Sequence, residues 1–261
     1  MTDLTKDLEL ALRLADTADA VTMARFGAND LAIETKPDRT PVTEADRAAE
    51  LAIREQISRE RPDDAVLGEE DGLSGSGDRV WVLDPIDGTK QYLRGLPSWG
   101  TLIALREADQ TLCAVVSAPA LGRRWWATLG GGAWSDGERL SVSPVSVLEG
   151  AVIMHGDISA WDPVGGPEPL INLIRDCWQS RGYGDFWGYC AVAEGKAEIC
   201  AEPGPTLWDL AAPALIVEEA GGRFSSLEGS KGPGHGSGLA TNGHLHDVAL
   251  AALAPSHGPV A

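Results

Sequence analysis

The sequence predicts a mixed α/β fold built from stacked layers of sheets and helices. Strand-like runs and amphipathic helix-like segments follow one another in blocks, and no internal repeat is visible, a pattern that favours a layered fold over a single α/β barrel. With 261 residues, 43% of them hydrophobic, the chain is long enough for one large domain or two closely packed halves. We expect a single domain over residues 1–261, with halves of about 1–145 and 146–261 that meet near Pro144–Gly150.

The first half is expected to begin with two helices and to continue as a sheet. Apolar residues recur at helical spacing over 3–26, and Thr43–Asp46 has the pattern of a capping box at the start of a second helix, which Pro62 ends. Strands are predicted at 31–36, 65–67, 79–83, 101–105, 112–117 and 124–129. The glycine- and serine-rich segment 72–78 is expected to be a flexible loop.

The second half is expected to mix strands and helices. Strands are predicted at 151–154, 197–201 and 239–241, and helices at 169–178, 186–193, 210–220 and 245–253. Gly221-Gly222 is a typical helix stop. His244 and His246 are expected to lie on the surface of the terminal helix.

Charge and cysteine content exclude several classes of function. A formal net charge of −18 disfavours nucleic acid and anionic membranes as partners, and no run of eighteen apolar residues predicts a membrane span. The N-terminus is acidic and periodic, unlike a secretory signal, so we expect a cytoplasmic protein. The four cysteines lack zinc-site spacing and are expected to be reduced and buried.

Residues 81–90 carry the most specific chemical signal. A short apolar run ends in Asp84 and Asp87, and Gly88 and Thr89 follow at once. Carboxylates and a carbonyl are ligands for hard cations, while backbone N–H groups and a hydroxyl bind phosphate oxygens. The element therefore favours metal-assisted phosphoryl chemistry.

Three further acidic positions lie at the ends of predicted elements. Asp46 fits a capping box as well as a catalytic role. Asp209 fits a helix N-cap as well as a metal ligand, and Glu69 lies in an acidic turn that can equally be a solvated one. From the residues alone, both interpretations stay open at each position.

Taken together, three motifs resemble those of the inositol monophosphatase family. They are Gly68-Glu69-Glu70, Asp84-Pro85-Ile86-Asp87-Gly88-Thr89 and Leu207-Trp208-Asp209-Leu210-Ala211-Ala212, in order over nearly the whole chain. The resemblance implies the layered αβαβα sandwich of the sugar phosphatases, Mg²⁺-dependent hydrolysis of phosphate monoesters, and a homodimer.

The same resemblance assigns roles to individual residues. The positions that match the two main metal sites are Glu69, Asp84, Asp87, Asp209 and the carbonyl of Ile86, and Glu69 is also expected to be catalytic, with Asp46 and Thr89. Asp46 matches a position that works with Thr89 to orient or deprotonate a metal-activated water for in-line attack, and that helps to hold a third, weaker ion. Contacts to the substrate are expected from Ile86, Asp87, Gly88, Thr89 and Asp209. Mn²⁺ and Zn²⁺ stay open as alternatives to Mg²⁺, because carboxylate sites discriminate poorly.

The segment Arg181–Tyr189 departs from the small, Ser/Ala-rich turn of typical inositol phosphatases. It looks like the branch of the family that acts as histidinol-phosphatase in histidine biosynthesis, whose substrate carries an amine and an imidazole. Asp185 and Glu202 can pair with those groups, and Arg181 can bind a substrate oxygen or an acidic ligand. Tyr183 or Trp187 can face the imidazole ring. In the alternative interpretation these aromatic residues belong to the core or to a dimer interface, and Asp185 is only a helix N-cap.

The predicted function is therefore that of a Mg²⁺-dependent histidinol-phosphatase acting on a small phosphorylated metabolite. An inositol-1-phosphatase or a broad sugar phosphatase is the alternative within the class. A catalytically inactive, acidic cation-binding protein is the alternative from another class. The intact set of acidic residues argues against this last alternative.

Overall fold

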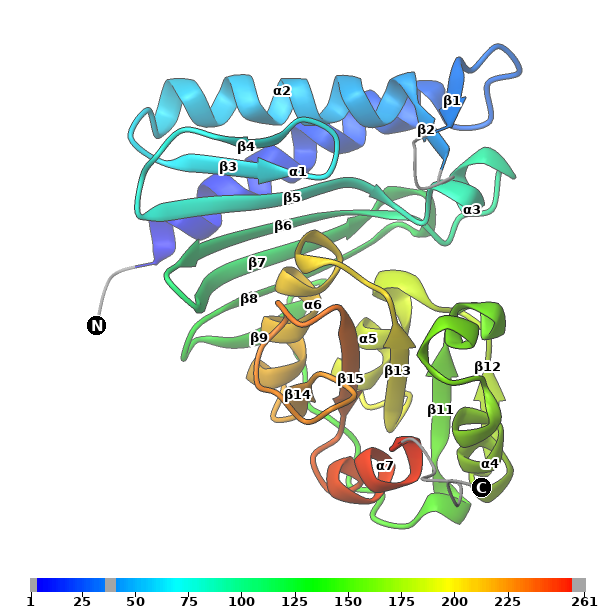
Figure 1. Cartoon of the computed structure of the whole chain (residues 1–261). Helices are drawn as coiled ribbons and strands as arrows, with labels where there is room; N and C mark the ends of the chain where they lie inside the picture. The colour runs from blue at the N-terminus through cyan, green and yellow to red at the C-terminus, as the bar shows by residue number, and fades with distance from the viewer. Residues whose placement is uncertain (1–3, 36–40, 255–261) are drawn as a thin grey trace.

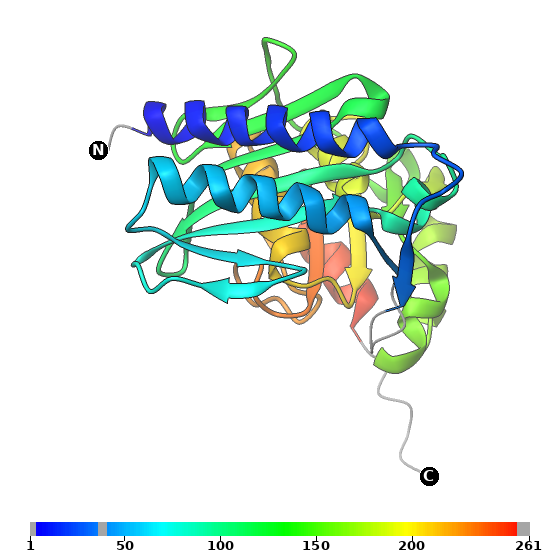
Figure 2. The same ribbon diagram turned by 90° about the horizontal axis from the view of Figure 1, so that it is seen from above.

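Five layers of helices and sheets, in the order αβαβα, make up the computed structural model, which describes residues 4–35 and 41–254 (Figure 1). The outermost layer consists of α1 (Thr5–Arg25) and α2 (Glu44–Glu60), which lie side by side across one face of the first sheet (Figures 1 and 2). Their apolar stripes, represented by Leu14 and Ile53, are fully buried against it, as the periodicity of an amphipathic helix requires. Both predicted N-terminal helices are confirmed.

The first sheet has eight strands in the order β10-β9-β8-β7-β6-β5-β3-β4. They are β3 (Ala65–Gly68), β4 (Gly72–Ser74), β5 (Arg79–Asp87), β6 (Gly100–Glu107), β7 (Gln110–Ala118), β8 (Arg123–Thr128), β9 (Gly132–Ser135) and β10 (Glu138–Arg139). Only β3 and β5 run parallel. The expected flexible loop over 72–78 is wrong for β4, which pairs with β3. A separate two-stranded ladder joins β1 (Ile33–Thr35) to β2 (Pro41–Thr43).

The middle layer consists of α5 (Asp185–Ala193) and α6 (Leu207–Glu219), packed between the two sheets. All residues from 210 to 217 are buried, because a helix enclosed by two sheets has no solvent face. The helix predicted at 210–220 begins three residues earlier, since Thr206 precedes it as N-cap.

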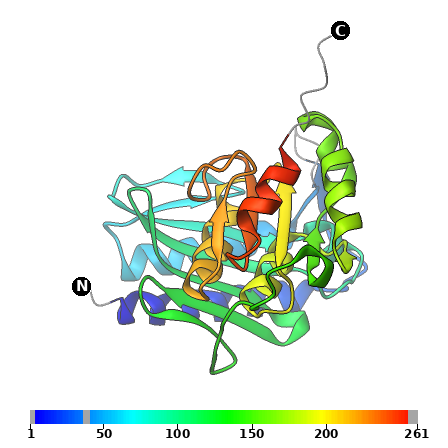
Figure 3. The same ribbon diagram turned by 90° about the horizontal axis from the view of Figure 1, so that it is seen from below.

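The second sheet has five strands in the order β12-β11-β13-β15-β14. They are β11 (Val152–His155), β12 (Gln179–Arg181), β13 (Ile199–Pro203), β14 (Arg223–Ser225) and β15 (Ser237–Thr241). Its outer face is covered by α4 (Glu168–Asp176) and α7 (His246–Leu253), as Figure 3 shows. Short helices are α3 (Thr89–Leu93), η1 (Pro119–Leu121), η2 (Leu148–Gly150) and η3 (Ile158–Val164).

Two smaller expectations are corrected by the structure. His246 is fully buried at the start of α7, whereas His244 is exposed. All four cysteines are free, but Cys177 is only partly buried. Within the described residues, no helix has both the length and the apolar composition of a membrane span.

Candidate active site

Three carboxylates from two distant segments of the chain meet between the two sheets. Asp84 and Asp87 come from the end of β5, and Asp209 comes from the first turn of α6. One carboxylate oxygen of each lies within 4.8 Å of the others. Among the residues that the structure describes, no salt bridge involves any of the three. We call these residues the acidic triad.

Burial and mutual repulsion raise the pKa of all three carboxyl groups. The pKa of Asp84 lies well above its usual range because of burial and then of the charges of Glu69, Asp87 and Asp209. The pKa of Asp87 is also raised well above its usual range, first by burial, and burial raises the pKa of Asp209 to about 6. Buried acids without a counter-charge are unfavourable unless a cation balances them. Since hard divalent cations take carboxylate oxygens as ligands, the triad fits a divalent-cation site.

An irregularity at the end of β5 allows both of its aspartates to join the triad. Residues three apart on a regular strand point to opposite faces of the sheet. Between Asp84 and Asp87, however, the register against β6 shifts, and Asp84 Oδ1 accepts the N–H of Ile86 at 3.0 Å. Gly88 follows with φ +84°, a left-handed conformation that favours glycine, and acts as the N-cap of α3.

Asp87 and Asp209 are each held by a backbone N–H from the middle layer. Asp87 Oδ2 accepts the N–H of Phe186 at 2.6 Å. Asp209 Oδ2 accepts the N–H of Thr206 at 2.6 Å and its hydroxyl at 3.1 Å, which closes a capping box at the start of α6. The expected N-cap role is therefore displaced by three positions, since Thr206 is the N-cap and Asp209 is its partner.

Asp46 combines the structural and the functional interpretation. Its Oδ2 accepts the N–H of Thr43 at 2.9 Å and the hydroxyl of Thr43 at 2.5 Å, which closes the capping box of α2. Its Oδ1 lies 3.4 Å from the hydroxyl of Thr89, which also lies 3.0 Å from the carbonyl of Ile86. Burial raises the pKa of Asp46. Helix capping thus occupies one oxygen and leaves the other facing Thr89.

Glu69 lies next to the triad but outside it. It follows β3 directly, and its N–H donates to the carbonyl of Leu83 at 3.1 Å. Its charge raises the pKa of Asp84 and of Asp209. Glu69 also lines a cavity of about 560 Å³ that reaches Thr89, Lys90 and Arg94.

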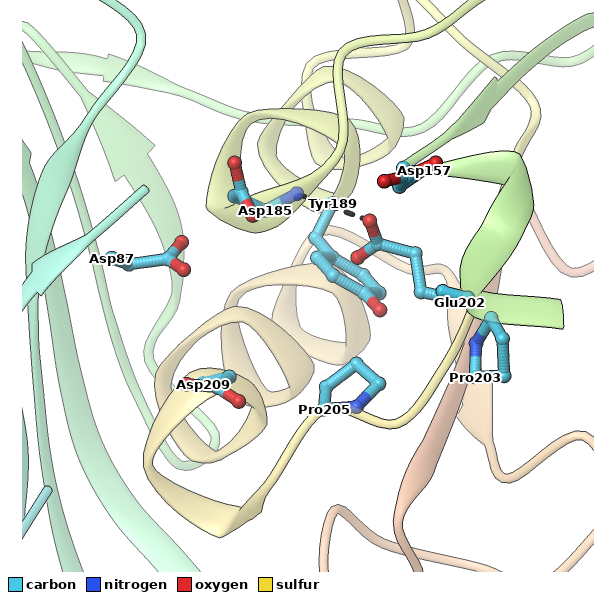
Figure 4. Close-up of a pocket in the computed structure, with 10 residues that line it drawn as sticks. Asp87, Asp157, Asp185, Tyr189, Glu202, Pro203, Pro205 and Asp209 are labelled. Atoms are coloured by element: carbon cyan, nitrogen blue, oxygen red, sulfur yellow. Dashed lines mark hydrogen bonds between the residues drawn. The ribbon is translucent and has the colours of Figure 1, made fainter. Parts of the chain in front are cut away.

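A second cavity, of about 220 Å³, adjoins the first and shares Asp87, Asp157, Asp185 and Asp209 with it; Figure 4 shows its lining. Its lining includes Asp87, Asp157, Asp185, Tyr189, Glu202 and Asp209. Five of these six side chains are acidic, and among the residues that the structure describes no Lys, Arg or His lines this cavity. We call it the acidic cavity.

Asp185 and Glu202 form one wall of the acidic cavity. Glu202 Oε1 accepts the N–H of Asp185 at 3.1 Å, and the side-chain amide of Gln91 donates to Asp185 Oδ2 at 2.6 Å. Asp185 has φ +55°, a left-handed conformation that is uncommon outside glycine. Burial raises the pKa of Glu202 to about 8. The N-cap interpretation of Asp185 is wrong, because Gly184 occupies that position and the Asp185 side chain binds Gln91.

The aromatic residues of 183–189 divide between the core and the two cavities. Phe186 is buried in the core. Tyr183 is 51% exposed, lines the larger cavity and lies against Trp187 at a ring-centroid distance of 5.0 Å. Tyr189 is buried but lines the acidic cavity. Arg181 is exposed and lines neither cavity; its guanidinium donates to the preceding carbonyl.

Sequence reasoning did not single out Tyr189 or Asp157 as site residues. Tyr189 lies one helical turn after Asp185 on α5, so the two share a helix face. That spacing was the available signal, but it is equally typical of a core aromatic residue. Asp157 follows the end of β11 and is the N-cap of η3.

Comparison with known proteins agrees with this geometry. The sequence profile of the inositol monophosphatase family matches residues 3–258. A histidinol-phosphatase of Streptomyces coelicolor is 53% identical over 262 residues, which cover 97% of this chain and 98% of the relative. A histidinol-phosphatase of Mycobacterium tuberculosis is also 53% identical, over 95% of this chain and 97% of the relative.

Solved structures of similar proteins have the same layers. The extragenic suppressor protein suhB of Bartonella henselae superposes with a TM-score of 0.91 at 27% identity, over 97% of this chain and 100% of that one. An IMPase of Thermotoga maritima superposes with a TM-score of 0.87 at 29% identity, over 95% and 97% of the two chains. The expected αβαβα fold is thereby confirmed.

Proposed function

This chain belongs to the inositol monophosphatase family, and from that premise we propose that it is a Mg²⁺-dependent phosphate monoester hydrolase whose substrate is histidinol phosphate. The observation that carries the choice of substrate is the acidic cavity beside the triad, whose lining, over residues 4–35 and 41–254, contains no basic side chain. Such a cavity suits an alcohol that carries positive charge and disfavours a second phosphate group. The 53% identity to two histidinol-phosphatases supports the same choice.

The proposed cofactor is Mg²⁺, with two ions in the site and a third, weaker one near Asp46. The ligands in this proposal are Glu69, Asp84, Asp87, Asp209 and the carbonyl of Ile86. When bound, such ions neutralise phosphoryl charge and lower the pKa of a water molecule. Mn²⁺ and Zn²⁺ stay as alternatives, because the ligand set is built from oxygen atoms alone.

In this proposal the protein handles the proton through Asp46 and Thr89. The Thr89 hydroxyl has a single proton, and its two neighbouring acceptors are Asp46 Oδ1 and the Ile86 carbonyl. Thr43 fixes the orientation of the Asp46 carboxylate. A buried carboxyl group with a raised pKa is a better proton acceptor at neutral pH than an exposed one.

The two cavities give the substrate an orientation. Lys90 and Arg94 line only the larger cavity, where Gly88 and Thr89 also lie, and this side suits the phosphate. Glu202 and Tyr189 line only the acidic cavity and Asp185 lines both cavities, and this side suits the amine or the imidazole. Of the other proposed contacts, Asp87 and Asp209 line both cavities and Ile86 lines only the larger one. Arg181 is not part of the proposed site.

Phosphate release from a panel of esters tests the function. The panel contains histidinol phosphate, inositol-1-phosphate, fructose-1,6-bisphosphate and 3′-phosphoadenosine phosphate, each with Mg²⁺ and with Mn²⁺. We expect kcat/KM for histidinol phosphate to exceed every other by about tenfold or more, or about 1.4 kcal/mol. A reversed preference for inositol-1-phosphate would support the broader phosphatase instead. No turnover of any ester would support the inactive cation-binding protein.

Asp185→Asn tests the proposed contact to the cationic part of the substrate. Asparagine tolerates the left-handed backbone at this position and keeps an acceptor for Gln91. The loss of charge is therefore expected to reduce kcat/KM for histidinol phosphate by about tenfold more than for a simple aryl phosphate. Equal losses on both substrates would mean that Asp185 has only a structural role.

The homodimer, the cytoplasmic location and the single domain over 1–261 remain predictions. Light scattering coupled to size-exclusion chromatography measures the oligomeric state directly. A monomer at micromolar concentration would contradict the homodimer.

A further inference from the structure

Behind the turn that carries Glu69, α2 buries an ion pair between Glu50 and Arg54. The two side chains are 0% and 12% exposed, and Arg54 Nε donates to Glu50 Oε1 at 2.8 Å. Well-packed apolar residues are often as stabilising as a buried ion pair. The presence of this pair therefore calls for a reason other than stability.

Both carboxylate oxygens of Glu50 bind the backbone of the turn. Oε2 accepts the N–H of Glu70 at 2.9 Å, and Oε1 accepts the N–H of Asp71 at 3.0 Å. The N–H of Glu69 itself donates to the carbonyl of Leu83, in the strand that carries the first triad residue. Three consecutive amides are thus fixed, one to β5 and two to α2. The backbone that carries Glu69 has little freedom left.

The residues on either side of the turn are adapted to this ion pair. A Cβ atom at Gly68 would lie 2.2 Å from Glu50 Oε1, so only glycine leaves room for the carboxylate. Arg54 donates to the carbonyl of Gly72 at 2.6 Å and to the hydroxyl of Ser74 at 2.7 Å. The ion pair therefore contacts the turn along its whole length, from β3 to β4.

The helix that carries the ion pair also carries Asp46. Asp46 and Glu50 lie one turn apart on α2, and both are buried; Asp46 faces Thr89, whereas Glu50 faces the backbone of the turn. One rigid helix thereby holds the neighbour of Thr89 and the support of Glu69 at a fixed spacing.

We propose that Glu50 and Arg54 are positioning residues that hold Glu69 toward the acidic triad and so set the affinity of the cation site. The inference rests on the proposed function, because it requires Glu69 to be a ligand. Residues that support metal ligands from behind typically change metal affinity or activity by about 10–100-fold when they are replaced.

Glu50→Gln tests the proposal in the full-length chain. Glutamine offers a single acceptor oxygen, so one of the two turn amides loses its partner and the charge opposite Arg54 is lost. The matched control is Glu219→Gln. Glu219 also accepts two backbone N–H groups of a turn, those of Gly130 and Gly132, at 2.7 and 2.8 Å, but it lies at the opposite end of α6 from Asp209.

Three quantities are measured for each variant: the Kd for Mn²⁺ of the metal-free chain by calorimetry, the Mg²⁺ concentration for half-maximal activity, and Tm. We expect Glu50→Gln to raise the first two by about tenfold or more, and Glu219→Gln to leave both within about twofold. A Glu50→Gln variant that loses Tm like the control and keeps both values within about twofold of the unmodified chain would overturn the proposal. No Mn²⁺ binding by the unmodified chain would instead overturn the metal-dependent function itself.

Arg54→Lys keeps the proposal testable if Glu50→Gln does not fold. Lysine retains the charge opposite Glu50 but cannot reach Glu50, Gly72 and Ser74 at once as the guanidinium does. We expect the Kd for Mn²⁺ to rise by more than about twofold without a change in KM for substrate at saturating Mg²⁺. An unchanged Kd would overturn the proposal.

Discussion

Asp87 is oriented by the protein without being neutralised by it. The N–H of Phe186 fixes its Oδ2 but supplies no full charge. Burial and the neighbouring Asp185 and Asp209 raise its pKa. The carboxylate is therefore placed for a cation, and its repulsion from its neighbours is a cost that the fold carries until a cation binds.

Asp87→Asn tests whether the charge of Asp87 serves cation binding at the expense of the stability of the metal-free chain. Asparagine keeps an oxygen for the N–H of Phe186 but removes one of the repelling charges, so we expect turnover to fall by about a hundredfold or more at saturating Mg²⁺. The Tm of the metal-free chain is expected to stay equal or rise. Turnover is measured by steady-state assays, and Tm by thermal unfolding of the same preparation. Unchanged activity would contradict the assignment of Asp87 as a metal ligand.

The sequence predicts which residues belong to the site better than it predicts the role of each side-chain oxygen. Asp46 and Asp209 each fitted two interpretations, and the structure shows that each carboxylate caps a helix with one oxygen. A sequence pattern cannot show that the two oxygens of one carboxylate have different roles. Tyr189 was missed because a buried aromatic residue on α5 is normally core, and only its place beside Glu202 brings it to the cavity.

Among the elements, α7 is attached to the second sheet by a buried histidine. The hydroxyl of Ser225 donates to the carbonyl of Ser226, so it accepts from His246 Nε2 at 3.0 Å. The hydroxyl of Thr241 lies 3.0 Å from Nδ1 and can donate to it. This arrangement suits the neutral ring, and burial, followed by the charge of Arg223, lowers the pKa of His246 to about 4.

The sign of the pH effect follows from that shift. The unfolded chain titrates this histidine near its usual pKa of about 6.5, so between that pH and about 4 the unfolded state binds the extra proton. Stability from His246 is therefore present above about pH 6.5 and is lost as pH falls toward 4. We expect Tm to fall with acid more steeply in the unmodified chain than in His246→Gln. Parallel curves of Tm against pH would contradict the buried neutral ring.

Three of the strands that the sequence does not predict share a physical reason. β4, β12 and β14 have three residues each and lie at sheet edges, so none is long enough to display alternation. The long helices and the central strands were found because their apolar periodicity is sustained. Their ends differ by a few residues where a cap, such as Thr206 before α6, decides the start.

At the scale of the whole molecule, the site lies where separate parts of the chain meet. The first sheet supplies Asp84 and Asp87, the middle layer supplies Asp209, and the second sheet supplies Glu202. Spacing in the sequence could suggest these residues, but only the packing of the layers brings them together. A cation bound here would link the first sheet to the middle layer, in a chain with a formal net charge of −18.

This arrangement predicts how stability depends on pH and on Mg²⁺. In the metal-free chain, burial raises the pKa of Asp209 to about 6 and that of Glu202 to about 8, above their unfolded values, so the native state binds more protons and stability falls as pH rises from about 4 to 8. Mg²⁺ binds the ionised groups, and at a hundred times its Kd it adds about 2.7 kcal/mol. We therefore expect Mg²⁺ to raise Tm more at pH 8 than at pH 5, where protons compete with it.

Thermal unfolding in Mg²⁺ and in KCl at equal ionic strength distinguishes site binding from general screening of the −18 charge. Asp87→Asn is the matched variant, because it removes one ligand and changes the net charge by a single unit. Its Mg²⁺-dependent rise in Tm should be much smaller than that of the unmodified chain, while its response to KCl should be the same. Equal stabilisation by the two salts, or a Mg²⁺ effect that does not depend on pH, would show that the acidic triad does not bind the cation.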